Sequence, residues 1–512
     1  MHRLSTFCLA LLPLGFLLVM VAAPLGALSL YDDGSGGAVW ADVLADGYIR
    51  GRIVWTVVQA AVTAVLTLLL GVPAAWVLAR LAFPGRALIL RLLMLPFVMP
   101  TLVAGMGVLA LFGTNGLLFS DGRDTPYLLL YGNVFFNLPV LVRAAYQGFN
   151  QVPAARLTAA QTLGAGAWAR FRHIELPVLR PWLAGGMCLV FLYCFSGFGL
   201  ALLLGGTAYS TVEVEIYRLI TVELDMAQAG VLVWLSLGIT LVSGAAYAFF
   251  SRRTHSGRRI VPLPPQAPSR PLHYAAIAAA AAVLAVCCAL PLAAVWAQAA
   301  TAGASWRVLL ETDTLSAAAN TLRFTFSAIP PALILGISHA ALARRMPWLR
   351  GITFLPFMVS PVCISFGLLL LYPQWTASLP LLIAAYALLA YPFITKDLLA
   401  AWDALPERYA RAAQTLGAGG FQTALRITAP LLLPAVRRGT TLAAATCAGE
   451  FAATLFLSRP EWTTLTTLIY QYLGTAGSDN HDKAMVLTAA LMTLAAAVFL
   501  LLDPREQRPP PY

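Results

Sequence analysis

Apolar segments long enough to cross a membrane dominate this sequence and limit the folds it can adopt. An α-helix needs about 20 apolar residues to span the hydrocarbon core of a bilayer, and the chain holds about twelve such segments. Of its 512 residues, 60% are hydrophobic and 11% are charged, whereas soluble domains carry about 25% charged residues. This pattern excludes an ordinary soluble enzyme and predicts an all-α membrane protein with about 12 transmembrane helices. The apolar windows are 5–30, 53–79, 87–112, 127–149, 182–204, 228–250, 274–300, 318–343, 350–372, 379–401, 439–458 and 484–502.

The charges between these windows predict how the chain is oriented. Lys and Arg number 33 and Asp and Glu number 22, which gives a net charge of +11. Positive residues collect on the cytoplasmic side of membrane proteins, so the loop with Arg80 and Arg86 is expected inside. The loop with Glu213 and Glu215 is expected outside. This alternation predicts a multi-pass membrane protein with both termini in the cytoplasm.

A basic, proline-rich segment separates two halves of similar length. Residues 251–271 contain five arginines and several prolines, and proline interrupts a helix. A nucleic-acid patch is the alternative function for these arginines, but they lie where the positive-inside rule places them, so no nucleic-acid partner is expected. The expected organisation is a first helix and periplasmic loop (1–50), module 1 (51–250), a cytoplasmic linker (251–273), a seventh helix and periplasmic loop (274–313), module 2 (314–503) and a cytoplasmic tail (504–512).

An internal repeat relates the two modules. The segment AAQTLGAG occurs at residues 159–166 and again at 412–419, an offset of 412 − 159 = 253. The same offset maps Pro153 onto Pro406 and Phe198 onto Phe451. Six spans separate the copies, so both modules have the same orientation in the membrane. We therefore expect two parallel modules related by a pseudo-two-fold axis along the membrane normal, with the substrate path between them.

Each copy of the repeated segment lies in an expected cytoplasmic loop with the sequence features of a helical hairpin. Pro153 and Pro406 suit a first helical turn, and Gly164 and Gly417 allow a left-handed bend after the helix. An amphipathic hairpin on the membrane surface is the alternative, but it would favour large apolar side chains. Two matching surfaces of small residues instead predict two docking sites for a partner with two-fold symmetry.

These residues resemble the EAA loop of type I ABC importer permeases. In that family the loop forms the coupling helix, which fits a groove on the ATPase subunit. The second copy departs from the pattern at Ala429, where leucine is usual, and the glutamate before the alanines is replaced by Thr158 and Arg411. The resemblance covers nearly the whole chain and implies two fused permease modules in a bacterial inner membrane. The ATPase-coupling residues that it implies are Ala159, Ala160, Gly164, Ile174, Leu176, Pro177, Ala412, Ala413, Gly417, Ile427 and Pro430.

The sequence contains no ATP-binding loop of its own. A P-loop requires a glycine-rich turn that ends in Gly-Lys-Ser or Gly-Lys-Thr, and the two lysines of the chain, Lys396 and Lys483, precede Asp397 and Ala484. We therefore expect a transport subunit with no catalytic residues and no bound cofactor. The resemblance implies two copies of a cytoplasmic ABC ATPase that use ATP and Mg²⁺, and a periplasmic substrate-binding protein. The sequence is most similar to the thiamine branch of the family, and the ferric-iron branch is the alternative.

Glu450 is the candidate for contact with a substrate. It lies near the middle of the eleventh apolar window, where a carboxylate must face a polar cavity or a partner group. A cationic substrate, a backbone amide or a basic side chain would each serve as that partner. Phe198 and Phe451 are candidates for an aromatic lining of the path. The seven cysteines show no C-x-x-C spacing, so no metal site is expected. A twelve-helix secondary transporter is the alternative of another class, but it would require more intramembrane carboxylates.

Overall fold

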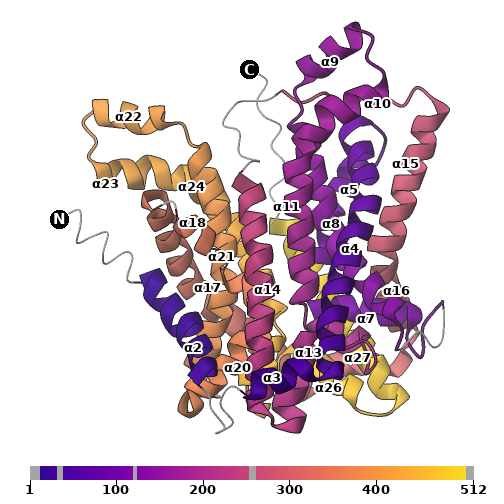
Figure 1. Cartoon of the computed structure of the whole chain (residues 1–512), viewed down its shortest axis with the longest axis vertical. Helices are drawn as coiled ribbons and strands as arrows, with labels where there is room; N and C mark the ends of the chain where they lie inside the picture. Colours follow the sequence, from indigo (N-terminus) through magenta and orange to yellow (C-terminus); the bar gives the residue numbers. More distant parts are fainter. Residues whose placement is uncertain are drawn as a thin grey trace.

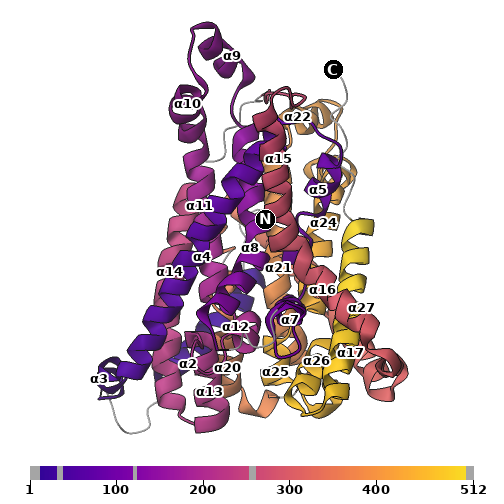
Figure 2. The ribbon, with the colours of Figure 1, turned by 90° about the vertical axis from the view of Figure 1, so that its right-hand side faces the viewer.

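The computed structural model describes residues 12–30, 38–118, 124–252, 261–346, 348–353, 355–376 and 378–502, and these residues are almost entirely helical. Long helices run roughly parallel through the molecule (Figure 1). The short helices α9 (Ala154–Thr162) and α22 (Glu407–Thr415) lie at the same end of the molecule, on opposite sides of it in Figure 1. The short helices α13 (Val212–Arg218) and α26 (Leu465–Gly474) lie at the opposite end in both views (Figure 2). We name the end with α9 and α22, which lie in the predicted coupling loops, the coupling-loop end, and the end with α13 and α26 the far end.

Eight helices in the described part of the chain are long and apolar enough to span a membrane, and they match eight of the twelve predicted windows. A bent pair, Arg86–Val98 and Thr101–Phe112, turns through 103° and makes a ninth candidate. In the described residues, the remaining windows contain the shorter apolar helices Leu12–Leu28 and Pro361–Leu371 or a helix break, so the all-α architecture with about 12 membrane segments agrees with the prediction. The eight spans are Gly47–Arg80, Pro126–Asn150, Ala167–Phe195, Met226–Ser251, Pro271–Thr301, Thr312–Arg345, Leu379–Ala404 and Ser478–Leu500.

The helix interruptions repeat in the two modules. Helix α11 (Leu176–Phe195) ends before Ser196, and α12 (Gly199–Leu204) begins three residues later. Helix α24 (Ala429–Ala448) ends before Gly449, and α25 (Ala452–Leu457) begins at the same spacing. Each break lies 253 residues from its counterpart, because 448 − 195 = 253. The internal repeat of the sequence is thus a repeat of backbone structure.

The first helix of each half packs against the other half. Helix α2 (Ala23–Leu30) lies against α20 (Pro361–Leu371) of module 2. Helix α16 (Leu290–Thr301) lies against α7 (Thr101–Phe112) of module 1. A glycine permits each close approach: a Cβ at Gly107 would lie 3.0 Å from the Pro291 carbonyl oxygen, and a Cβ at Gly367 would lie 2.8 Å from Pro24 Cβ. The two modules therefore share one interlocked helical core.

The described end of the linker is attached to module 1. The Ala154 amide donates to the Val261 carbonyl at 3.1 Å, and the Ala82 amide donates to the Gln266 carbonyl at 2.8 Å. Beside these contacts Arg80 and Glu175 form a buried ion pair at 2.7 Å. The linker thus fastens the base of the first coupling loop to the end of α4 (Gly47–Arg80).

Candidate functional site

The two coupling loops have the same backbone conformation. In the first, α9 ends at a left-handed Gly164 with φ +79°, and α10 (Ala167–Arg170) follows. In the second, α22 ends at Gly417 with φ +83°, and α23 (Gly420–Thr423) follows. The amides of Gly164 and Ala165 donate to the carbonyls of Gln161 and Ala160 at 3.0 and 2.9 Å, which is a Schellman turn. The predicted helix, glycine bend and helix are confirmed in both modules.

The predicted coupling residues lie on these two loops, at the same end of the molecule. They divide by exposure into a set that is exposed and a set that is half-buried or buried. Their role in ATPase docking stays a prediction. The exposed residues are Ala159, Gly164, Pro177, Ala412, Gly417 and Pro430, whereas Ala160, Ile174, Leu176 and Ile427 are half-buried and Ala413 is buried.

Sequence reasoning missed the large apolar side chains on the same surfaces. Leu163 and Leu416 precede the bend glycines and are 87% and 88% exposed. Trp168 and Phe421, which follow the bends, are 70% and 80% exposed. Apolar groups that protrude in matching positions are typical of anchors that fill a partner's pocket. The leucine was already present in both copies of AAQTLGAG, and its duplication next to glycine was the available signal.

Replacing Leu163 and Leu416 together with aspartate is expected to prevent the ATPase subunit from co-purifying, because a charge would replace each apolar anchor. Truncation of such an anchor costs about 2 kcal/mol or more per site. The matched control is Leu310→Asp, at a leucine that is 80% exposed outside the coupling loops. Equal ATPase recovery with the double variant and with wild type would contradict the anchor assignment.

A cavity of about 230 Å³ lies between the two modules, at the helix breaks. Both breaks contribute to its wall through Gly197 and Phe198 of module 1 and Glu450 and Phe451 of module 2. The rings of Phe198 and Phe451 stack across the boundary with centroids 6.0 Å apart and an angle of 18° between their planes. The structure therefore brings together the three residues predicted for the substrate path, although substrate contact by them stays a prediction.

Glu450 does not lie in the middle of a continuous span, as the sequence suggested. It lies in the break between α24 and α25, where its Oε1 accepts a hydrogen bond from the Ala453 amide at 2.9 Å. The carboxylate thereby caps the first turn of α25, which satisfies amides that a helix start leaves open. The side chain is half-buried in the cavity wall. The expected backbone partner is therefore present, in a position that also faces the cavity.

Two acidic residues expected on the outer side are buried among helices at the far end of the molecule. Glu213 and Glu215 lie in α13 and are 0% and 1% exposed. Glu215 accepts from the Tyr48 hydroxyl at 3.1 Å and pairs with Arg218 at 2.7 Å. The positive-inside rule placed them outside because they carry negative charge, but it carries no information on whether such a segment folds back between helices. The environment of Glu213 is described below.

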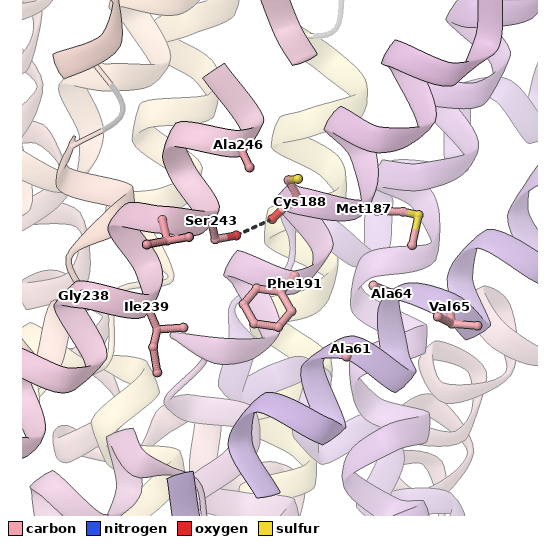
Figure 3. Close-up of a pocket in the computed structure, with 11 residues that line it drawn as sticks. Ala61, Ala64, Val65, Met187, Cys188, Phe191, Gly238, Ile239, Ser243 and Ala246 are labelled. Carbon is pink, nitrogen blue, oxygen red and sulfur yellow. Dashed lines mark hydrogen bonds between the residues drawn. The ribbon is translucent and has the colours of Figure 1, made fainter. Parts of the chain in front are cut away.

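A second cavity, of about 560 Å³, lies within module 1 alone, between α4, α11 and α14 (Met226–Arg252). Figure 3 shows Ala61, Phe191 and Ile239 lining it, and the Ser243 hydroxyl donating to the Cys188 carbonyl at 3.4 Å. Among the residues that the structure describes, no carboxylate or basic side chain lines this cavity. It does not contact the described part of module 2, so it is separate from the boundary where the two helix breaks meet.

Comparison with known proteins agrees with this architecture. The family model described as the inner membrane component of binding-protein-dependent transport systems matches residues 67–256 and 314–502. The thiamine transport system permease protein ThiP of Brucella abortus is 31% identical over 527 aligned positions, which cover 96% of this chain and 94% of that protein. The protein of the same name from Salmonella typhimurium is 27% identical to this chain, and the alignment covers 94% of that protein.

A shorter relative matches about one module. The sulfate transport system permease protein CysT of Salmonella typhimurium is 28% identical over 255 positions, which are 48% of this chain and 91% of that protein. The family model occurs twice, the two matches follow the structural repeat, and the ThiP proteins of Brucella abortus and Salmonella typhimurium are covered over 94% of their length. This chain therefore belongs to the family of inner membrane components of binding-protein-dependent transport systems, as a fused, two-module, multi-pass permease.

Proposed function

We propose that the chain forms the translocation path of an ATP-driven importer for thiamine or its phosphates. The observation that carries the proposal is the nearly full-length similarity to permeases named for thiamine transport. The cavity supports it, because a carboxylate beside two stacked phenylalanine rings suits a flat aromatic cation. Ferric iron is the alternative substrate, and a secondary transporter is the alternative of another class.

The partners in this proposal follow from the two ends of the molecule. Two copies of a cytoplasmic ATPase dock on the coupling loops and supply the ATP and Mg²⁺ chemistry, so the coupling-loop end and both termini lie in the cytoplasm. A periplasmic binding protein delivers substrate at the far end. ATP binding and hydrolysis then favour different arrangements of the two modules, which open the path to one side at a time.

The decisive experiment reconstitutes the chain in liposomes with its ATPase and binding protein and measures ATP hydrolysis. Thiamine-loaded binding protein is expected to stimulate hydrolysis, and iron-loaded protein is not. Stimulation by the iron-loaded binding protein alone would identify ferric iron, and not thiamine, as the substrate. An ATPase that never associates with the chain would overturn the ATP-driven mechanism and favour the secondary transporter.

Glu450→Gln isolates the charge of the proposed substrate contact. The glutamine oxygen can still accept from the Ala453 amide, so the cap on α25 is retained. Loss of a charged interaction worth about 1.5–3 kcal/mol lowers the rate of thiamine uptake at low substrate about 10- to 150-fold. Glu461→Gln, at an exposed glutamate of the same module, is the control. Full transport by the Glu450 variant at normal expression would remove Glu450 from the substrate path.

A further inference from the structure

Four aromatic side chains lie together at the module boundary: two phenylalanines of the cavity wall and two tyrosines that pack against them. Tyr217 of α13 contacts Phe198 with ring centroids 5.5 Å apart, and Tyr470 of α26 contacts Phe451 at 5.2 Å. The two tyrosines, like the two phenylalanines, are 253 residues apart in the repeat. The helices that carry the tyrosines lie at the far end of the molecule (Figures 1 and 2). We name Phe198, Tyr217, Phe451 and Tyr470 the aromatic cluster.

Glu213 lies one helical turn before Tyr217 and connects the two modules. Its carboxylate accepts a hydrogen bond from the Ser236 hydroxyl of α14 at 2.9 Å, within module 1. The other oxygen accepts from the hydroxyl of Ser360, the residue that caps α20 of module 2. The thiol of Cys363, also in α20, lies 3.8 Å from that oxygen. A fully buried carboxylate thus links α13 to the opposite module.

The repeat position in the described part of module 2 makes no equivalent link. The repeat partner of Glu213 is Thr466, because 466 − 213 = 253. Its hydroxyl donates to the Glu450 carbonyl at 3.0 Å, within its own module. The contact made by Glu213 is therefore one-sided, and nothing in the repeat itself requires it. A buried carboxylate is costly, so its presence at one of two equivalent positions calls for a specific role.

We propose that Glu213 is a positioning residue that holds the aromatic cluster closed at the far end of the path. Through Ser360 and Cys363 it fixes α13 against α20 of module 2, and α13 carries Tyr217 into the cluster. When the modules separate at this end, water can replace the hydrogen bonds that the carboxylate loses. An apolar contact at the same place would instead expose its surface to water, and opening would cost more free energy. The contact can therefore form and break in each transport cycle. The inference rests on the proposed ATP-driven function.

Two serine variants test the proposal without removing the carboxylate. Ser360→Ala removes the donor from the opposite module, and Ser236→Ala removes the donor from the same module. Loss of one hydrogen bond to a charged group shifts the closed-to-open ratio about 10-fold. Ser360→Ala is expected to raise ATP hydrolysis several-fold, by roughly this factor at most, in the absence of binding protein. Ser236→Ala is expected to leave hydrolysis at the wild-type level. Ser360→Thr keeps the hydroxyl and the cap, so its hydrolysis is also expected at the wild-type level, below that of Ser360→Ala.

Cys363 gives a second measurement that does not depend on hydrolysis. Its side chain is 2% exposed in the closed contact, so a membrane-impermeant maleimide added from the periplasmic side reacts slowly with it. Ser360→Ala and Glu213→Leu are expected to accelerate this labelling, followed by peptide mapping. Glu215→Leu is the matched control, because Glu215 lies on the same helix but bonds to Tyr48 and Arg218 of module 1.

The outcomes separate the inference from the function on which it rests. If the wild-type chain couples to its ATPase but the Ser360 and Ser236 variants behave alike in hydrolysis and labelling, Glu213 has no positioning role. If all variants label faster, including Glu215→Leu, the effect is general unfolding and the proposal is also overturned. A wild-type chain that binds no ATPase contradicts the proposed function, whereas the labelling of Cys363 still tests the contact.

Discussion

Replacing Gly164 and Gly417 together with valine is expected to abolish transport and ATPase association while the protein remains inserted in the membrane. Both glycines have φ near +80°, a conformation that costs a residue with a Cβ about 1–2 kcal/mol. Valine is also β-branched, which increases the strain. A Cβ at either position would meet no atom within 4 Å, so the change acts on the bend and not on packing.

The matched control lies two residues further along each loop. Gly166 and Gly419 have φ −65°, and a Cβ at either position would meet no atom within 4 Å, so valine fits there without backbone strain. The measurements are uptake in vesicles and the amount of ATPase that co-purifies, each normalised to inserted protein. Undiminished co-purification with the Gly164 and Gly417 variant would count against the coupling assignment. Equal loss in the control pair would show that side-chain size on the loop matters and the bend does not.

Leucine at both Gly107 and Gly367 is expected to prevent the two halves from assembling. At these glycines the neighbouring atoms belong to the backbone and rings of Pro291 and Pro24, which cannot move aside as a flexible side chain can. Overpacking of this kind costs about 1–3 kcal/mol per site, and here it acts on both exchanged helices at once. We expect a broad or aggregated elution profile in detergent and a lower melting temperature.

The control for these variants is Gly238→Leu. Gly238 is also a glycine of a spanning helix, but a Cβ there would meet no atom within 4 Å, and it lies on the wall of the apolar cavity in module 1. Leucine is expected to be tolerated at that position. A monodisperse Gly107 and Gly367 variant with a wild-type melting temperature would show that the two close contacts are not needed for assembly.

Much of the architecture was predictable because its causes are local. The apolar windows and the repeat in AAQTLGAG come from composition and spacing, and the coupling bends come from glycine chemistry at Gly164 and Gly417. The helix breaks were missed because the windows remain apolar across them. A hydropathy window does not distinguish a continuous helix from two short ones, although Pro100 and Gly449 lie at such breaks.

The less predictable features depend on contacts between distant segments. Glu213 was assigned to the outer side because of its negative charge, and α13, with only seven residues, is too short to form an apolar window. Its buried position requires Ser360, 147 residues away. The exchange of first helices likewise has no local signal, because the proline and glycine in each contact lie on different halves. The sequence singled out Phe198, Glu450 and Phe451, which line the cavity between the modules, but it did not indicate that the two helix breaks meet there.

The exchanged first helices also impose an order on how the protein is made. Pro24 contacts Gly367, and 367 − 24 = 343 residues separate them. At roughly 5–20 residues per second of synthesis, the first helix waits about 17 to 70 seconds in the bilayer before its partner emerges. Module 1 in turn lacks the helix that contains Pro291 until the linker has been synthesised. The two repeats therefore cannot mature one after the other, and the ribosome must deliver most of the chain before either half is complete.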